Sequence, residues 1–236
     1  MKLPVIFAVT DADVLSEDLF KRFQKTVTAE RLSKAEKFYR REDACRSLLS
    51  ESLIRYTFLK AGLQCCGEIE LTRNEFGKPE WALGGFHFNV SHSGAWVVCA
   101  ADKEEIGVDV ERIHKVDSGI SQRFFSSIEN KLLSDFQSPT QWLDCFYKLW
   151  VLKESYIKAI GKGLHCPLNS FAVLPQNDSS AQLIRYEETL PQKYFRIYEI
   201  DTAYKCALCC SHQDFPQEVK IVSAQEILCK LESKNF

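Results

Sequence analysis

The feature that most constrains the fold of this chain is one pattern that occurs twice. Residues 86–102, FHFNVSHSGAWVVCAAD, contain two runs of strand-forming residues joined by a Ser-Gly turn. Residues 194–211, YFRIYEIDTAYKCALCCS, repeat this order of strand, tight turn and apolar strand. Each segment comes after a region with helical periodicity, and the two agree in pattern rather than in identical residues. The repeat predicts two similar α/β halves, residues 1–104 and 105–236, joined near 102–106.

Helices are predicted where apolar residues recur at spacings of three and four. One helical region runs from Thr28 to Lys60, with Thr28 as its N-cap and Gly62 as its C-terminal stop. Two more cover about 118–135 and 142–161, and a short helix is expected over 224–236. Strands are predicted at 3–9, 106–113, 170–174 and 182–186, so the expected fold class is α+β.

Composition bounds the size of the fold and its partners. With 236 residues, 45% of them hydrophobic, the chain is large enough for one larger domain or two small ones. Its net charge of −2 and its pI of about 6.2 argue against nucleic acid as a partner. No run of 18 apolar residues occurs, so we expect no membrane span and no membrane partner.

The N-terminal segment and the cysteines predict a cytoplasmic protein. Residues 1–18 lack the apolar region and cleavage site of a secretory signal, and 3–9 are predicted as a strand instead. The chain has 10 cysteines but a single CxxC motif, at Cys206 and Cys209, within an alternating pattern typical of a buried strand. We interpret most cysteines as small core residues in a reducing compartment; disulfides or a zinc site are the less favoured alternative.

Two acids lie close together on one predicted strand. Asp109 and Glu111 are separated by one residue, so their side chains point to the same face, about 7 Å apart at the backbone. Val108 and Val110 then face a core. The local pattern alone favours a strand with a solvated polar face, but the two carboxylates could also converge on one cation.

A third acid lies in the helix predicted over 142–161. Lys153 falls on the apolar side of this helix, Glu154 lies at the flank of that side, and Lys158 follows Glu154 by one turn. The simpler interpretation is a lysine that extends to solvent and an exposed ion pair. However, charges beside apolar residues are costly unless something else occupies the site, and a phosphate with a metal ion would do so.

Three carboxylates with nearby lysines suggest a site for Mg²⁺ and phosphate. Mg²⁺ takes oxygen ligands, usually one or two carboxylates with water and substrate phosphate. Lysines, Lys153 among them, and a histidine such as His92 would hold the remaining phosphate charge. A Ser-His-Asp hydrolase is a weaker alternative because no G-x-S-x-G motif occurs, and the chain has no Rossmann or P-loop glycine motif.

Several segments, taken in order, resemble the 4′-phosphopantetheinyl transferases. They are ERLSKAEKFYRREDACRSLL (30–49), FGKP (76–79), FNVSHS (88–93), GVDVE (107–111), RFFS (123–126), LWVLKESYIKAIGKGL (149–164) and YKCALCCSHQDFP (204–216). The likeness is strongest to the long, monomeric Sfp type, which activates nonribosomal peptide and polyketide synthetases. It covers nearly the whole chain, and the motifs G-[VI]-D-x-E and W-x-x-K-E-[SA] together are highly specific.

The resemblance implies both a fold and an activity. The family has two similar α/β halves related by pseudo-twofold symmetry, and coenzyme A binds in the cleft between them. Its members transfer the phosphopantetheine arm of coenzyme A to a serine of an apo acyl or peptidyl carrier protein and release adenosine 3′,5′-bisphosphate. A monomer is expected by the same analogy. Whether the carrier serves fatty acid, polyketide or peptide synthesis is left open.

The resemblance also assigns roles to residues of this chain. It implies Asp109, Glu111 and Glu154 as Mg²⁺ ligands, with Lys158 beside the pyrophosphate. Ser91 and His92 would touch the phosphates, the loop 77–79 would lie beside the adenine nucleotide, and positions 31, 34, 46 and 47 would hold the 3′-phosphate. The residues expected to contact coenzyme A are therefore Arg31, Lys34, Arg46, Ser47, Gly77, Lys78, Pro79, Ser91, His92, Asp109, Lys153 and Lys158.

Catalysis requires a base because a serine hydroxyl is a poor nucleophile. Glu154 is the candidate base, and Lys158 would stabilise the transferring phosphoryl group. Glu129 either assists or is a solvated helix-capping acid. The alternatives to a transferase are a coenzyme A-binding protein without activity and an unrelated Mg²⁺-dependent phosphohydrolase.

Overall fold

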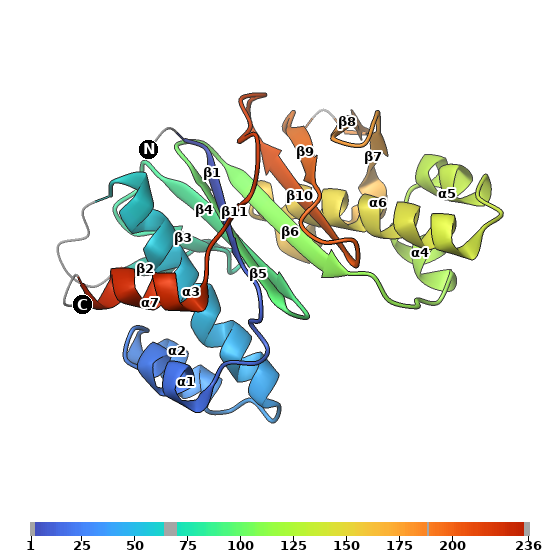
Figure 1. The fold of residues 1–236 in the computed structure, drawn as a ribbon. Coiled ribbons are helices and arrows are strands. Elements are labelled where there is room, and N and C mark those ends of the chain that lie inside the picture. Colours follow the sequence, from blue (N-terminus) through green and yellow to red (C-terminus); the bar gives the residue numbers. More distant parts are fainter. Residues whose placement is uncertain (1–2, 64–69, 188, 234–236) are drawn as a thin grey trace.

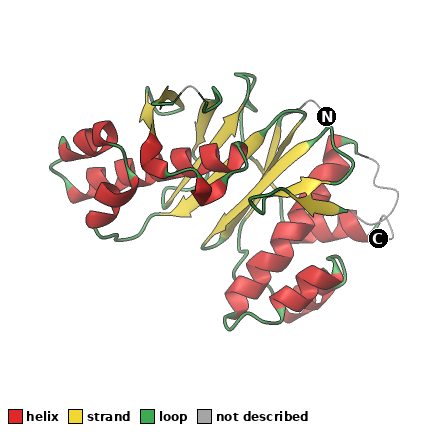
Figure 2. Ribbon diagram, turned by 180° about the vertical axis from the view of Figure 1, so that it is seen from behind, coloured by secondary structure: helices red, strands yellow, loops and turns green. Residues whose placement is uncertain are grey.

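Two β-sheets lie side by side in the middle of the molecule, and helices cover their outer faces (Figures 1 and 2). The computed structural model describes residues 3–63, 70–187 and 189–233. Each sheet has its own long helix, and both of these helices have 21 residues. The α+β class predicted from the sequence is confirmed.

The first unit contains the four-stranded sheet, in the order β11-β1-β5-β4. Its strands are β1 (Val5–Val9), β4 (His87–Ser93), β5 (Trp96–Asp102) and β11 (Lys220–Ile221). Its helices are α1 (Glu17–Gln24), α2 (Ala29–Ala35), α3 (Arg41–Ala61) and α7 (Ala224–Glu232). A separate hairpin of β2 (Leu71–Arg73) and β3 (Pro79–Trp81) stands beside them.

The second unit contains the five-stranded antiparallel sheet, in the order β6-β10-β9-β8-β7. Its strands are β6 (Ile106–Arg112), β7 (Phe171–Pro175), β8 (Ser180–Arg185), β9 (Tyr194–Tyr198) and β10 (Tyr204–Cys210). Its helices are α4 (Gly119–Phe124), α5 (Ser127–Ser134) and α6 (Pro139–Ala159), with short 3₁₀ turns at Gly163–His165 and Leu168–Ser170.

The expected division of the chain at 104/105 falls between β5 and β6. The C-terminal elements β11 and α7, however, do not lie in the second unit. β11 pairs in parallel with β1, and α7 packs on α3 through Ile227, Leu228 and Leu231. Residues 220–232 therefore belong with the first unit, although the sequence prediction places them in the second half.

The two sheets share a buried core. Val108 and Val110 of β6 pack with Trp96 and Val98 of β5 and with Leu208 of β10. The expectation that both valines face a core is therefore confirmed. The shared core fixes one unit against the other, so residues of β4 and β6 can form a single site.

Local capping explains where the structure departs from the predicted helices. Thr28 caps α2 as predicted, and Gly62 ends α3 with φ of 84°. The single helix expected over 28–60 is divided, because α3 begins anew at Arg41 with Glu42 and Asp43 in its first turn. The region 118–135 is likewise divided, since Ser126 begins α5 with a capping box.

The cysteines in the described part of the chain are all free thiols, and each is buried except Cys229. Cys206, Cys209 and Cys210 lie on β10 in the core, as the pattern predicts. Cys65 and Cys66 lie outside the described residues. None of the described helices combines the length and the apolar character that a membrane crossing requires.

Candidate active site

The edges of the two sheets meet at β4 and β6, and side chains join them. Ser91 Oγ donates a hydrogen bond of 2.8 Å to Asp109 Oδ1, and Ser93 Oγ donates one of 2.8 Å to Glu111 Oε2. Because alternate residues of a strand face the same way, these two serines contact the two acids of β6 in register. The end of β4, residues 91–93, and the paired acids of β6 therefore form one site.

Helix α6 reaches this site because Gly107 has no side chain. A Cβ atom at Gly107 would overlap the carbonyl oxygen of Ser155 and the nitrogen of Ala159. The backbone of α6 therefore lies directly on β6 at Gly107, two residues before Asp109. Because the helix lies so close to the strand, Lys158 Nζ reaches Asp109 Oδ1, at 2.5 Å. Close packing of α6 on β6 therefore explains why the GVDVE motif has a glycine at this position.

The carboxylates of Asp109, Glu111 and Glu154 share this region with the ammonium group of Lys158. Burial, followed by the charge of Asp109, raises the pKa of Glu111 to about 7. The same two causes, in the same order, raise the pKa of Glu154. Burial lowers the pKa of Lys158, but Asp109 and the other acids outweigh it, so the net shift is upward. The carboxylates therefore outnumber the ammonium group of Lys158, and a bound cation would offset the excess negative charge.

A buried and unpartnered oxygen of Asp109 is the strongest indication of a ligand site here. Its side chain is 2% exposed, and its Oδ2 has no hydrogen-bond partner among the described residues. Over 3–63, 70–187 and 189–233, no three His, Cys, Asp or Glu side chains form a complete metal-binding group. The donor set fits Mg²⁺, which needs only one or two protein carboxylates when a substrate phosphate supplies further oxygens.

Lys153 lies elsewhere, in the core of the second unit. Its Nζ donates to Glu129 Oε1 at 2.6 Å and to the carbonyl oxygen of Phe171 at 2.7 Å, and both charged side chains are fully buried. The sequence argument correctly put Lys153 on the apolar side of α6. The structure does not bring it to the phosphate-facing residues, so we no longer count it as a coenzyme A contact.

Glu129 is a structural acid. Its Oε2 accepts from the backbone nitrogen and hydroxyl of Ser126, which closes the capping box of α5, and its Oε1 accepts from Val173 N at 2.8 Å. Together with Lys153, these bonds satisfy the buried carboxylate. The structure therefore supports the capping interpretation, but the expectation that this acid is solvated is wrong because Glu129 is fully buried.

The turn between β4 and β5 is held from both units. Arg46 donates to the carbonyl oxygen of Gly94 at 2.9 Å and to Asp43 Oδ1 at 2.6 Å. Tyr204 accepts from Ala95 N at 3.0 Å. Desolvation, followed by the charges of Arg46 and Lys158, lowers the pKa of His92. Arg46 thus anchors the turn that follows β4, the strand on which His92 lies.

The loop 74–79 is tied to the second unit. Lys78 Nζ donates to the carbonyl oxygens of Ile106 at 3.2 Å and Ala159 at 3.1 Å, and burial lowers its pKa to about 8. Asn74 donates to Gly161 O at 3.0 Å and accepts from Lys78 N at 2.9 Å. The amino group of Lys78 therefore links the two units, while the backbone of Gly77 and Pro79 shapes the loop.

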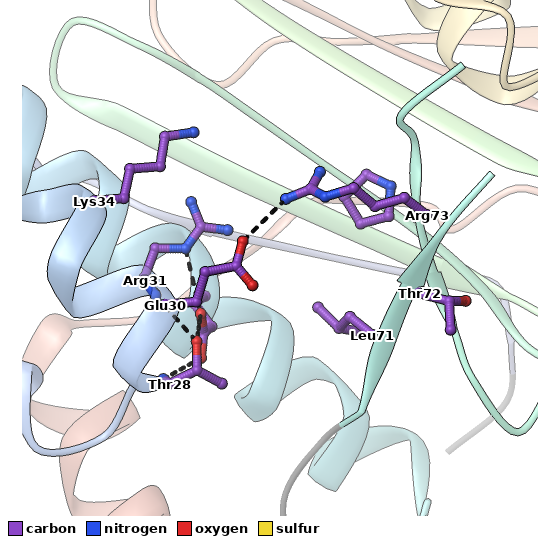
Figure 3. A pocket seen from close by; sticks show the side chains of 9 residues that line it. Thr28, Glu30, Arg31, Lys34, Leu71, Thr72 and Arg73 are labelled. Atoms are coloured by element: carbon purple, nitrogen blue, oxygen red, sulfur yellow. Dashed lines mark hydrogen bonds and ion pairs between the residues drawn. The ribbon is translucent and has the colours of Figure 1, made fainter. Parts of the chain in front are cut away.

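A cationic cavity lies apart from the three acids, between α2, α3 and the β2–β3 hairpin (Figure 3). Its volume is about 110 Å³. It is lined by Thr28, Glu30, Arg31, Lys34, Glu51, Leu71, Thr72, Arg73 and Pro79. Two of the residues expected to hold the 3′-phosphate, Arg31 and Lys34, meet here, and Arg31 Nη1 lies 3.5 Å from Ser47 Oγ.

The wall of this cavity is organised by a buried acid that the sequence argument missed. Glu51 is 5% exposed; it accepts from Thr28 N at 2.7 Å, from Arg31 Nε at 3.2 Å and from Arg55 Nη2 at 3.1 Å. These bonds fix Arg31, while Arg55 balances the charge of Glu51. The signal in the sequence is the pair Glu51 and Arg55, an acid and a base four residues apart on one helix.

Comparison with known proteins agrees with this arrangement. The family model "4′-phosphopantetheinyl transferase superfamily" matches residues 105–209, and "4′-phosphopantetheinyl transferase, N-terminal" matches 15–104. The fold and the site therefore define a transferase of the phosphopantetheinyl class.

Full-length relatives agree with these matches. The chain is 39% identical to "4′-phosphopantetheinyl transferase Sfp" of Bacillus subtilis (strain 168), over 91% of this chain and 95% of that protein. It is 34% identical to "4′-phosphopantetheinyl transferase gsp" of Aneurinibacillus migulanus, over 92% and 90%. The chain belongs to the 4′-phosphopantetheinyl transferase family and is of the Sfp type.

Proposed function

We propose that this transferase uses coenzyme A as the donor and Mg²⁺ as its metal, and that it modifies a serine of an apo acyl or peptidyl carrier protein. Adenosine 3′,5′-bisphosphate would be the second product. One observation carries the proposal: Ser91 and Asp109, on adjoining strands of the two units, meet Lys158 of α6 within 3.0 Å. A diphosphate can be gripped there from both units.

Asp109, Glu111 and Glu154 are the acids from which the metal would take its one or two protein ligands. Asp109, Glu111 and Glu154 influence one another electrostatically, and the unpartnered Oδ2 of Asp109 is available as a ligand. When bound, Mg²⁺ neutralises charge that develops on the diphosphate of the donor. Lys158 contributes a second positive charge to the same oxygens.

The donor would lie between the diphosphate site and the cationic cavity. Arg31 and Lys34 supply two positive charges in the cavity, which suits the 3′-phosphate. Ser91 and His92 are the residues expected at the diphosphate. Ser91 already donates its hydroxyl proton to Asp109, so a ring N–H of His92 is the donor available there. Two separate anion sites match a donor that carries phosphate at two places.

Glu154 is the residue best suited to take the proton of the attacking serine. It lies on α6 one turn before Lys158, and burial with the charge of Asp109 raises its pKa. A carboxylate with a raised pKa accepts a proton more readily at neutral pH. Lys158 would then stabilise the phosphoryl oxygens while the bond to the adenosine-bearing phosphate breaks.

The test is the mass of the carrier. An apo carrier protein incubated with the enzyme, coenzyme A and Mg²⁺ should gain one phosphopantetheine on its serine, and a panel of acyl and peptidyl carriers identifies the preferred one. EDTA should stop the reaction and added Mg²⁺ should restore it. Asp109→Asn should slow transfer by about 100-fold or more, whereas Asp178→Asn, with a side chain 98% exposed, should not. Transfer that continues in EDTA would refute the metal assignment.

A further inference from the structure

The cationic cavity has a third positive residue, which comes from a different element. Arg73, at the end of β2, faces Glu30 of α2 across the cavity (Figure 3). Its Nη2 lies 3.7 Å from Glu30 Oε1, and its Nη1 donates to the carbonyl oxygen of Gly77 at 3.2 Å. One edge of the guanidinium is therefore held by the hairpin turn, and the other edge is directed to the cavity.

The ion pair across the cavity is weak. The side chains of Arg73 and Glu30 are 56% and 86% exposed, and their charged atoms are near the limit of ion-pair distance. Exposed pairs of this kind contribute little to stability, because solvent screens them and both side chains must be ordered. A ligand with more negative charge than one carboxylate can replace Glu30 as the partner of Arg73.

The charges of the wall favour a dianion. Arg31, Lys34 and Arg73 line the cavity with Glu30 and Glu51, and Arg55 pairs with Glu51 from behind. If Arg55 balances Glu51, three positive charges face the one negative charge of Glu30. A phosphate monoester carries about −1.5 to −2 at neutral pH, which matches this excess of two.

We propose that Arg73 is a third ligand of the donor's 3′-phosphate and that Glu30 is a competing counter-ion which the phosphate displaces. The inference rests on the proposed function, since it takes coenzyme A as the donor. It makes the β2–β3 hairpin part of the specificity for a 3′-phosphorylated donor. Glu30, by contrast, lowers the affinity for that donor. Removal of the Arg73 side chain should therefore weaken donor binding, and removal of the Glu30 side chain should strengthen it.

The experiment compares KM values for coenzyme A and for 3′-dephospho-coenzyme A. Arg73→Gln should raise KM for coenzyme A by about 5- to 20-fold, because a charge-assisted bidentate contact is lost. Glu30→Gln should lower it by about 2- to 5-fold. Neither substitution should change KM for 3′-dephospho-coenzyme A. Lys37→Gln removes an exposed cation just beyond α2, outside the cavity lining, and should change neither KM.

The outcomes separate the inference from the proposed function. Equal changes of both KM values in Arg73→Gln, or no change in either, would overturn the role of Arg73. A rise of KM for coenzyme A in Glu30→Gln would overturn the role of Glu30. If the unmodified protein transferred nothing from either donor to any carrier, the donor assignment itself would fail. Thermal unfolding of each variant checks the fold, which these exposed side chains should not affect.

Discussion

The ammonium group of Lys158 and the carboxylate of Asp109 form a direct ion pair of 2.5 Å in which only one carboxylate oxygen takes part. The second oxygen, Oδ2, is buried and has no partner among the residues described. The pair is therefore half-satisfied without a ligand, because a carboxylate can accept on both oxygens. Lys158 and a metal ion can bind Asp109 together, one at each oxygen.

Loss of Lys158 should make the protein depend on Mg²⁺ for stability. In Lys158→Met the buried Asp109 keeps its charge with only the hydroxyl of Ser91 as a partner, which costs about 3 kcal/mol. Added Mg²⁺ should then raise the melting temperature of Lys158→Met more than that of the unmodified protein. Differential scanning calorimetry with and without Mg²⁺ measures this, and Asp109→Asn is the control that should show no Mg²⁺ response. Equal Mg²⁺ shifts in all three proteins would contradict the assignment.

A methyl group at Gly107 should damage catalysis and packing together. In Gly107→Ala the new Cβ overlaps the backbone of α6 at Ser155 and Ala159, so the helix must move away from β6. We expect a loss of about 1–3 kcal/mol in the free energy of unfolding. We also expect the folded variant to transfer more slowly than the unmodified enzyme, because Lys158 moves with the helix, away from Asp109.

The matched control for that variant is Gly85→Ala. Gly85 has φ of 72°, but a Cβ there would meet no atom within 4 Å. Backbone strain alone should then cost about 1–2 kcal/mol with no change in the transfer rate of the folded enzyme. Urea unfolding and carrier modification, measured on both variants, test the difference. Similar losses of rate in the two would show that helix packing on β6 is not the cause.

The buried pair of Lys153 and Glu129 should affect stability and not donor binding. Lys153→Met leaves Glu129 buried and uncompensated, and we expect it to cost about 3–5 kcal/mol. Adding Glu129→Leu in the same chain should recover part of that loss. KM for coenzyme A in the folded double variant should equal that of the unmodified enzyme. A KM raised tenfold in the double variant would return Lys153 to the donor site.

Acid should weaken an ion pair beside the junction of the two units. Burial raises the pKa of Glu105, but its bond of 2.6 Å with Lys193 outweighs this, and the net shift is below 4.5. A carboxyl with a lowered pKa contributes stability that is present above the unfolded value and is lost as the pH falls through the folded value. The melting temperature of Glu105→Gln should therefore lie below that of the unmodified protein at about pH 7 and approach it at about pH 3.5. A difference that does not change with pH would contradict this.

The sequence predicts those parts of the site that depend on local spacing. Asp109 and Glu111 share a face because they are two apart on a strand, and the structure places them there. Thr28 and Gly62 mark helix ends through capping, which is also local. Lys153 shows the limit: its spacing gave the correct side of α6, but its partner Glu129 lies 24 residues away in the chain.

Contacts with distant backbone could not be predicted at all. The amino group of Lys78 bonds to the carbonyl oxygens of Ile106 and Ala159, and Arg46 bonds to that of Gly94. Every residue has a carbonyl oxygen, so no residue type marks such an acceptor in the sequence. Arg73 was missed for a related reason, because only the folded hairpin brings it opposite Glu30.

The return of β11 and α7 to the first unit bears on how the protein is made. β11 forms the edge of the first sheet beside β1, and α7 covers α3 (Figure 1). On the ribosome the N-terminal sheet thus remains one strand short while the whole second unit is being translated. Strand β1 acquires its neighbour β11 only after the second unit has been translated, so the nascent chain completes its first unit later than its second.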